Sequence, residues 1–286
     1  MESHDILLLE EGDPNSGFRT KNAPNEKARS VLVDEGNALV LRAALISVTH
    51  GDFTIGGDAA TLLIFEFNYL SMKGSRRFTS GKIKLRFDNA KGDVKNRPIV
   101  DKIAPTGAFS INKTTSRRDI HQVLNAGING EAIGIGPELG YLWETNVTKE
   151  KEHATRLAGV QRMLSEGSGR DDTVVWTLEE DPVRKQGIPS FLRSAVLLRR
   201  RADVPFYFTI DVTTGVDFEG RLRRLLGMDK RDPVDPVQVD GGTNLTELGI
   251  ASLDPKAGDI DLENMKAIDI GKKADVIVAT PLEVSG

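Results

Sequence analysis

The 286-residue sequence contains no cysteine, few aromatic residues and no long apolar run. Without cysteine the protein has no disulfide, thiol nucleophile or cysteine-ligated metal site, as is typical of the reducing cytoplasm. Aromatic residues make up only 6% of the chain, which leaves few stacking platforms for single-stranded nucleic acid. No segment reaches the length of a transmembrane helix, and the acidic N-terminal stretch lacks the features of a secretory signal. We therefore expect a soluble, cytoplasmic protein that has neither nucleic acid nor a membrane as its partner.

The charge is distributed unevenly along the chain. The whole sequence has a formal net charge of −4, but residues 232–286 carry eleven acidic and four basic residues, a net charge of −7. This segment opens with two Asp-Pro turns, which are typical of a boundary. We predict a body over residues 1–231 and a partly ordered acidic C-terminal extension over residues 232–286. Its run 275–284 is expected to add an edge strand.

Alternation of apolar and polar residues predicts an all-β body. In segment 76–90 the apolar face carries Ile83, Leu85 and Phe87, and the charged face carries Lys82, Lys84 and Arg86. A period of two with one charged face indicates a half-buried antiparallel strand. Similar strands are predicted at 61–70, 173–180, 193–201 and 205–214. The long apolar run 38–48 is a strand or a buried helix, and a strand is favoured. The loop 71–77 has the glycine and serine of a hairpin connection. About ten to twelve short strands predict an antiparallel β-sandwich, with a barrel as the second choice.

Helical signals are few. Residues 217–227 have an N-cap aspartate, apolar residues at helical spacing and a terminal glycine. Residues 115–127 are either helix or strand. For segment 121–163 we favour an edge hairpin whose charged central turn keeps other strands from pairing. A helix-containing insertion and a membrane-inserting hairpin are the alternatives.

The sequence between Thr61 and Gly227 contains several distinctive segments. It contains IFEFNY and RRFTSGKIKLRF, followed by VVWTLEEDPVRKQGIPSFLRSAVLLRRR and PFYFTIDV. These segments, through their Trp-Thr-Leu, Gly-Ile-Pro and Leu-Arg-Arg elements, resemble a group of uncharacterised proteins of filamentous fungi. The resemblance implies a fungal, intracellular β protein. It implies no activity, cofactor or site that can be transferred.

No catalytic or metal-binding motif stands out. The glycine-rich segment 126–140 is not followed by the Gly-Lys-Ser/Thr of a phosphate loop. The four histidines are scattered without metal-ligand spacing. We therefore predict no cofactor and no metal site, and we assign no catalytic residue.

Two groups of residues are candidate binding sites. The first is a basic surface formed by Arg184, Lys185, Arg193, Arg199, Arg200 and Arg201. Strand alternation divides these residues between two faces, which favours a solvated strand face or a docking site for the acidic tail over a polyanion site. The second is an apolar cavity between the sheets lined by Phe65, Phe67, Trp143 and Trp176. For the two tryptophans a core-anchoring role is favoured over ligand stacking.

These observations favour a non-catalytic binding protein with an unidentified protein or small-molecule partner. The alternative is an enzyme or accessory protein of fungal small-molecule (secondary) metabolism that uses the apolar cavity. A minor alternative is a membrane-acting β protein. Filled sheets favour the binding protein, whereas a deep pocket with converging polar groups favours the enzyme.

Overall fold

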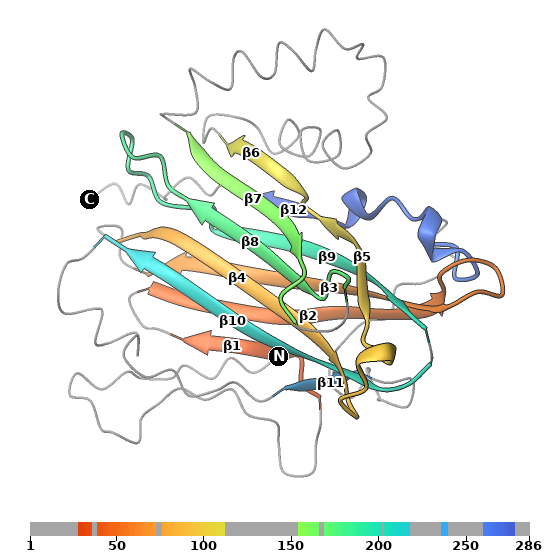
Figure 1. Cartoon of the computed structure of the whole chain (residues 1–286). Coiled ribbons are helices and arrows are strands. Elements are labelled where there is room, and N and C mark those ends of the chain that lie inside the picture. The colour runs from red at the N-terminus through yellow and green to blue at the C-terminus, as the bar shows by residue number, and fades with distance from the viewer. Residues whose placement is uncertain are drawn as a thin grey trace, which may run out of the picture.

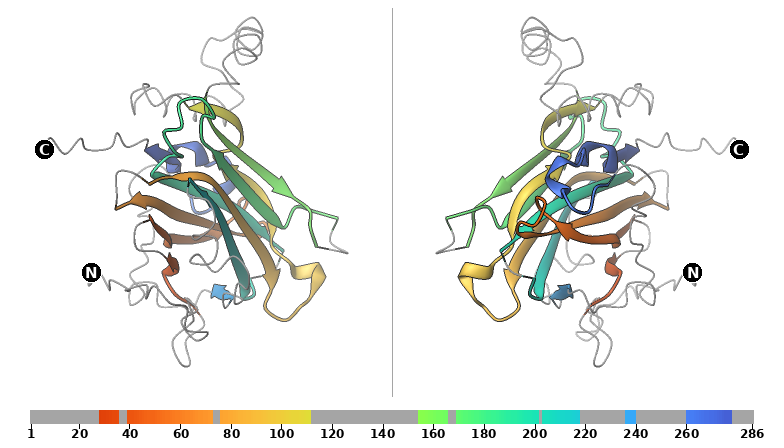
Figure 2. Two further views of the ribbon diagram at one scale, coloured as in Figure 1. Left: turned by 90° about the vertical axis from the view of Figure 1, so that its left-hand side faces the viewer. Right: turned by 90° about the vertical axis from the view of Figure 1, so that its right-hand side faces the viewer.

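The computed structural model describes residues 28–35, 39–72, 76–111, 154–165, 169–201, 203–217, 236–239 and 260–277. In this part of the chain, twelve strands form two six-stranded antiparallel sheets that do not close into a barrel (Figure 1, Figure 2). The predicted all-β sandwich is therefore confirmed. Its described helical turns are short 3₁₀ segments: η1 (Val94–Asn96), η3 (Met265–Ala267) and η4 (Ile270–Lys273). Residues 115–127, for which helix and strand were both left open, lie outside the described residues. So does the helix predicted at 217–227, except for its first residue.

The first sheet consists of β1 (Val31–Glu35), β2 (Leu39–Asp52), β3 (Ala59–Ser71), β5 (Ile99–Ala104), β9 (Phe191–Arg200) and β12 (Asp275–Ile277). Its order is β1-β2-β3-β9, and β5 and β12 share the far edge of β9. β12 pairs with the first three residues of β9, and β5 pairs with Ala195 to Arg199. The edge strand expected at 275–284 is thus confirmed for its first three residues.

The second sheet consists of β4 (Phe78–Asn89), β6 (Gly107–Ile111), β7 (Thr155–Arg162), β8 (Thr173–Glu179), β10 (Phe206–Val216) and β11 (Val237–Val239). Its order is β11-β10-β4-β8-β7-β6. Of the segment 121–163, the described part forms β7, which pairs with the edge strand β6. Both sheets contain a strand from beyond residue 231, and the boundary between body and extension stays a prediction.

The chain repeatedly crosses from one sheet to the other. The hairpin predicted at 71–77 is wrong, because β3 and β4 lie in different sheets. Alternation shows that a strand is half-buried, but it does not show which strand lies beside it. A loop of this length spans the roughly 10 Å between two packed sheets as easily as it closes a hairpin. The connections from β5 to β6 and from β9 to β10 cross in the same way.

The main core lies between the two sheets. On β4 the apolar residues Ile83, Leu85 and Phe87 are fully buried, and the basic residues between them face outward, as the alternation predicted. Across the core, Phe65 of β3 meets Phe208 of β10 edge to face, with ring centroids 5.5 Å apart. The two sheets are therefore held together by interdigitated apolar side chains.

A second apolar cluster covers the outer face of the first sheet. Residues 260–277, which contain η3, η4 and β12, place Met265 and Ile270 in one cluster with Leu62 and Ile64 of β3. This cover explains why β3 is buried on both faces from its second to its seventh residue. The sequence predicted a half-buried strand there, because alternation by itself does not show what lies over the outer face.

Main-chain and lysine contacts fix this cover in place. The amide of Asp52 donates to the carbonyl of Leu262 at 2.7 Å, and the amide of Lys266 donates to the carbonyl of Phe53 at 2.9 Å. The ammonium group of Lys102 on β5 donates to the carbonyl of Lys266 at 2.6 Å. Part of the C-terminal extension therefore docks through apolar packing and backbone hydrogen bonds.

A buried tyrosine in the main core gives the first testable prediction. Tyr69 is 3% exposed, and its hydroxyl has no hydrogen-bond partner among the described residues. Burial raises the pKa of its phenol. Because a buried unsatisfied hydroxyl is unfavourable, we expect Tyr69→Phe to raise the free energy of unfolding by about 1 kcal/mol in chemical denaturation. Tyr207→Phe, at a half-buried site on β10, is the control and should change stability by less than about 0.5 kcal/mol. A loss of stability in Tyr69→Phe would contradict the prediction.

Candidate functional site

The aromatic residues predicted to line a ligand cavity are packed in the core where the structure describes them. Phe65, Phe67 and Trp176 are fully buried. The ring centroids of Phe65 and Phe67 lie 6.4 Å apart, and those of Phe67 and Trp176 lie 6.5 Å apart. Such contacts are typical of a close-packed interior, which confirms the core-anchoring role of Trp176. Trp143 lies outside the described residues.

Two members of the predicted basic surface form ion pairs with residues in β3 or directly before it. Arg193 contacts Glu66 at 2.6 Å, and Arg199 contacts Asp58 at 2.6 Å. In the β12–β9 pair, Asp275 of the acidic extension lies opposite Arg193. Docking of the acidic tail on the whole basic stretch stays a prediction.

The other four members of the predicted basic surface lie in different environments. Arg184 and Lys185 are exposed in the loop that follows β8. Arg200 is 3% exposed, and its guanidinium lies 5.7 Å from the centre of the Phe206 ring. Arg201 is exposed just beyond the end of β9. The structure therefore divides the predicted surface between several sites.

Arg201 belongs to a small pocket at one end of the sandwich. The pocket lies where β4 and β9 end and β5 and β8 begin, and its volume is about 130 Å³. Its lining residues are Val94, Lys95, Arg97, Pro98, Ile99, Arg170 and Arg201. Four of these seven described residues carry a positive charge, and none of the seven is acidic.

Local hydrogen bonds shape the loop that carries Lys95 and Arg97. The side-chain oxygen of Asn89 accepts a bond of 2.8 Å from the amide of Lys91. Asp93 then caps η1 by accepting a bond of 2.9 Å from the amide of Lys95. Asparagine and aspartate favour such turns because their side chains bond to amides two residues further along. This sequence of short-range bonds sets the backbone from which the two basic side chains extend.

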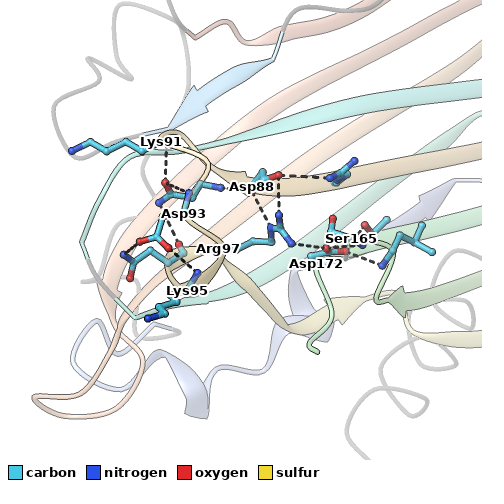
Figure 3. Close-up of polar contacts among 12 residues, drawn as sticks. Asp88, Lys91, Asp93, Lys95, Arg97, Ser165 and Asp172 are labelled. Carbon is cyan, nitrogen blue, oxygen red and sulfur yellow. Dashed lines mark hydrogen bonds and ion pairs between the residues drawn. The ribbon is translucent and has the colours of Figure 1, made fainter. Parts of the chain in front are cut away.

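Arg97 is held from behind by two carboxylates (Figure 3). It is 8% exposed; its Nε donates to Asp88 at 2.9 Å, and its Nη1 lies 3.8 Å from Asp172. Asp88 is on β4, and Asp172 directly precedes β8. The guanidinium is thus fixed against the second sheet while the residue contributes to the pocket lining.

Asp172 accepts several hydrogen bonds besides its contact with Arg97. It is 1% exposed. Burial by itself would raise the pKa of Asp172, but the hydrogen bonds it accepts outweigh this and hold the pKa below its ordinary value. The donors include the amides of Leu164 and Ser165 at 3.1 and 3.0 Å and the hydroxyl of Thr173 at 2.8 Å. Asp172 therefore stays charged and anchors Arg97 at neutral pH.

The segment that carries Arg170 is tied to both sheets. The carbonyl of Asp171 accepts from the amide of Val100 on β5 at 2.9 Å, and the carbonyl of Asp172 accepts from the amide of Phe87 on β4 at 2.9 Å. Arg170 therefore reaches the pocket from a backbone fixed on two sides.

This arrangement suits the recognition of an anion. Guanidinium groups present N–H donors in a rigid fork that matches carboxylate and phosphate oxygens. Pockets for whole drug-sized ligands measure about 300–1,000 Å³, so this smaller pocket fits one ionised group. The sequence singled out only Arg201 among the lining residues, because Lys95 and Arg97 lie on one loop and Arg170 on another, and neither loop carries a motif.

Other site types have no support in the described part of the chain. Within it, no group of three or more histidine, aspartate or glutamate side chains is placed to hold a metal ion. No helix there is long and apolar enough to cross a membrane. Comparisons with family models, curated proteins and solved structures gave no match.

Proposed function

We propose that this protein is a non-catalytic binding protein that recognises a ligand by an anionic group. The observation that carries the proposal is that four basic residues, Lys95, Arg97, Arg170 and Arg201, belong to the lining of one small pocket and that none of the described lining residues is acidic. A net positive pocket attracts anions and concentrates them at its mouth. Among the described lining residues there is no histidine, carboxylate or hydroxyl that would act as a general base or a nucleophile.

The packing of aromatic side chains between the sheets favours ligand binding at the surface over binding in the core. Phe65, Phe67 and Trp176 contact one another in the core. An enzyme with an apolar cavity between the sheets would need space at these rings. The pocket at the end of the strands, in contrast, is open to a ligand without any rearrangement of the core.

Two expectations from the sequence belong to the same proposal. Absence of cysteine supports a cytoplasmic location. The sequence segments between Thr61 and Gly227 support membership of the group of uncharacterised fungal proteins, which has no activity to transfer.

Calorimetric titration tests the proposed function. We expect acetate, inorganic sulfate or inorganic phosphate to bind with saturation. Arg201→Gln should weaken this binding at least tenfold, because a hydrogen bond to a charged group contributes about 1.5–3 kcal/mol. Arg184→Gln removes a similar charge outside the pocket and is the matched control. If none of the three anions binds, or if both variants weaken binding equally, the proposal is wrong.

A further inference from the structure

The outer face of the second sheet is accessible along several strands. On β4, Lys82 and Arg86 are exposed and Lys84 is half-buried, and on β7 Arg162 is exposed. These strands belong to the layer nearest the viewer in Figure 1. The outer face of the first sheet is different, because residues 260–277 pack on it. The second sheet therefore presents an open face on which a partner can dock.

Three of these cations form a row along β4, here called the β4 row: Lys82, Lys84 and Arg86. Alternate residues of a strand point to the same side and lie about 6.6 Å apart. Arg86 pairs with Thr173 of β8, and Thr173 pairs with Arg162 of β7. Because neighbouring strands lie about 4.8 Å apart, the backbone of Arg162 is about 10 Å from that of Arg86, and both side chains belong to the same face.

Much of the positive charge on this face has no carboxylate partner in the described part of the chain. Arg86 contacts Asp88 at 3.7 Å. Lys82, Lys84 and Arg162, in contrast, form no ion pair with any described residue. Accessible ammonium and guanidinium groups of this kind are available for charge-assisted hydrogen bonds to a partner.

Two carboxylates also belong to the face. Glu179 of β8 lies opposite Arg156 of β7, and Asp211 of β10 lies opposite Lys84. With Arg156, five basic and two acidic residues share the outward positions of β4, β7, β8 and β10. The face therefore keeps an excess of positive charge, which attracts an anionic partner.

The spacing of the β4 row fits an extended peptide. Alternate side chains of an extended chain also lie about 6.6 Å apart on one side, so acidic residues at every second position would each meet one cation of the row. Beside the row, Val175 of β8 is half-buried and Val160 of β7 is 45% exposed. Val175 pairs with both Lys84 and Val160, so a small apolar area adjoins the lysines and can contact the aliphatic parts of a bound segment.

The composition of the face favours a peptide over a nucleic acid. Single strands bind through bases stacked on aromatic side chains. Among the outward positions of β4, β7, β8 and β10, Tyr207 near one end of β10 is the single aromatic residue. Glu179 and Asp211 would repel a continuous phosphate backbone, whereas a peptide can place a neutral or basic residue beside each of them.

From this charge, spacing and apolar area we propose that the outer face of the second sheet binds an extended acidic segment of another protein, whose alternate carboxylates pair with the β4 row. The inference goes beyond the anion pocket, because no residue of the β4 row belongs to the described pocket lining. Its affinity comes from several accessible ion pairs, each contributing up to about fivefold. Binding should therefore weaken as salt is added.

The experiment titrates the full-length chain with two synthetic peptides of identical composition, followed by fluorescence anisotropy. In one peptide four glutamates alternate with four threonines, and in the other the four glutamates precede the four threonines. We expect the alternating peptide to bind about fivefold more tightly, because alternation alone places all four carboxylates on one side of an extended chain. An oligothymidylate of eight nucleotides should bind more weakly than the alternating peptide.

Variants of the β4 row locate the binding. The double variant Lys82→Gln with Lys84→Gln should weaken binding of the alternating peptide about tenfold, since two ion pairs are lost. Lys266→Gln with Lys272→Gln removes two lysine charges from the opposite side of the sandwich and is the matched control. Arg201→Gln, in the pocket, should also leave the affinity unchanged. Thermal unfolding shows whether each variant is folded.

Each other outcome overturns the inference. If the two peptides bind equally, or neither binds, the fit to the β4 row is wrong. If the oligothymidylate binds as tightly as the alternating peptide, the acidic-peptide class is wrong. If the control pair weakens binding as much as the β4 pair, the face is not the site. If Arg201→Gln does so, the peptide binds at the pocket, and the anion-binding function stands without a second surface.

Discussion

Replacing Trp176 with alanine is expected to lower the free energy of unfolding by about 3–5 kcal/mol. The indole is fully buried on β8 and contacts Phe67 across the core. Its Nε1 also donates a hydrogen bond of 2.9 Å to the carbonyl of Pro105, where the chain passes from β5 in the first sheet to β6 in the second. Alanine would leave a cavity and would remove the hydrogen bond from the indole to the Pro105 carbonyl.

The surroundings of Trp176 explain why the loss should be large. Gly159 on β7 lies opposite Trp176, and a Cβ there would overlap the Pro105 carbonyl and the indole. Because the groups around the indole are packed so closely, they have little freedom to move into the cavity that Trp176→Ala would leave. A cavity that stays open increases the loss of stability. Trp176→Phe keeps an aromatic ring and loses the N–H donor, so its cost should be clearly smaller. Urea denaturation measures both variants, and a loss below about 1 kcal/mol for the alanine variant would contradict this role.

The second large effect is expected for Asp172→Ala. Removing one partner of a buried ion pair costs about 3–5 kcal/mol, because the remaining charge is left uncompensated. Here Arg97 would lose one of its two carboxylates, and the amides of Leu164 and Ser165 would lose their acceptor. Asp171→Ala changes the neighbouring carboxylate, which is more exposed, and should cost less than about 1 kcal/mol. Equal losses in the two variants would show that the Asp172 network does not contribute specifically.

The pH dependence of the same variant has a definite sign. The pKa of Asp172 is lower in the folded protein than its ordinary value of 3.8. Its stabilising contribution is therefore complete above about pH 4 and is lost as the pH falls through the folded value. The difference in unfolding free energy between the wild type and Asp172→Ala should be constant from pH 7 to pH 5 and should shrink below about pH 4. A difference that grows on acidification would contradict the assignment.

How far the sequence predicts the fold depends on what covers each strand. On β4, one face contacts the core and the other faces outward, so simple alternation identified the buried residues correctly. On β3 and β9 residues 260–277 cover the outer face. Alternation predicted that this face is exposed, and that prediction was wrong. The signal for this cover was present in the unbroken apolar runs Leu62–Phe65 and Ala195–Leu198, because strands buried on both faces are typically continuous apolar runs.

The candidate site could not be predicted from the sequence for a different reason. Lys95 and Arg97 share one loop, but Arg170 and Arg201 are far from it and from each other along the chain, and the three segments meet only where several strands begin or end. No spacing rule connects residues on independent loops. The sequence instead grouped Arg201 with its neighbours Arg199 and Arg200, which the structure directs to an ion pair with Asp58 and to the ring of Phe206.

The contribution of late strands to both sheets has a consequence for biosynthesis. Neither sheet is complete until β11 and β12 have been made, and the cover over Leu62 and Ile64 is among the last described residues of the chain. A nascent chain that has emerged only as far as β10 therefore exposes an apolar sheet face and open strand edges to other chains. Such surfaces favour aggregation during folding. We expect this protein to depend on delayed folding or on chaperone protection until translation has passed residue 277.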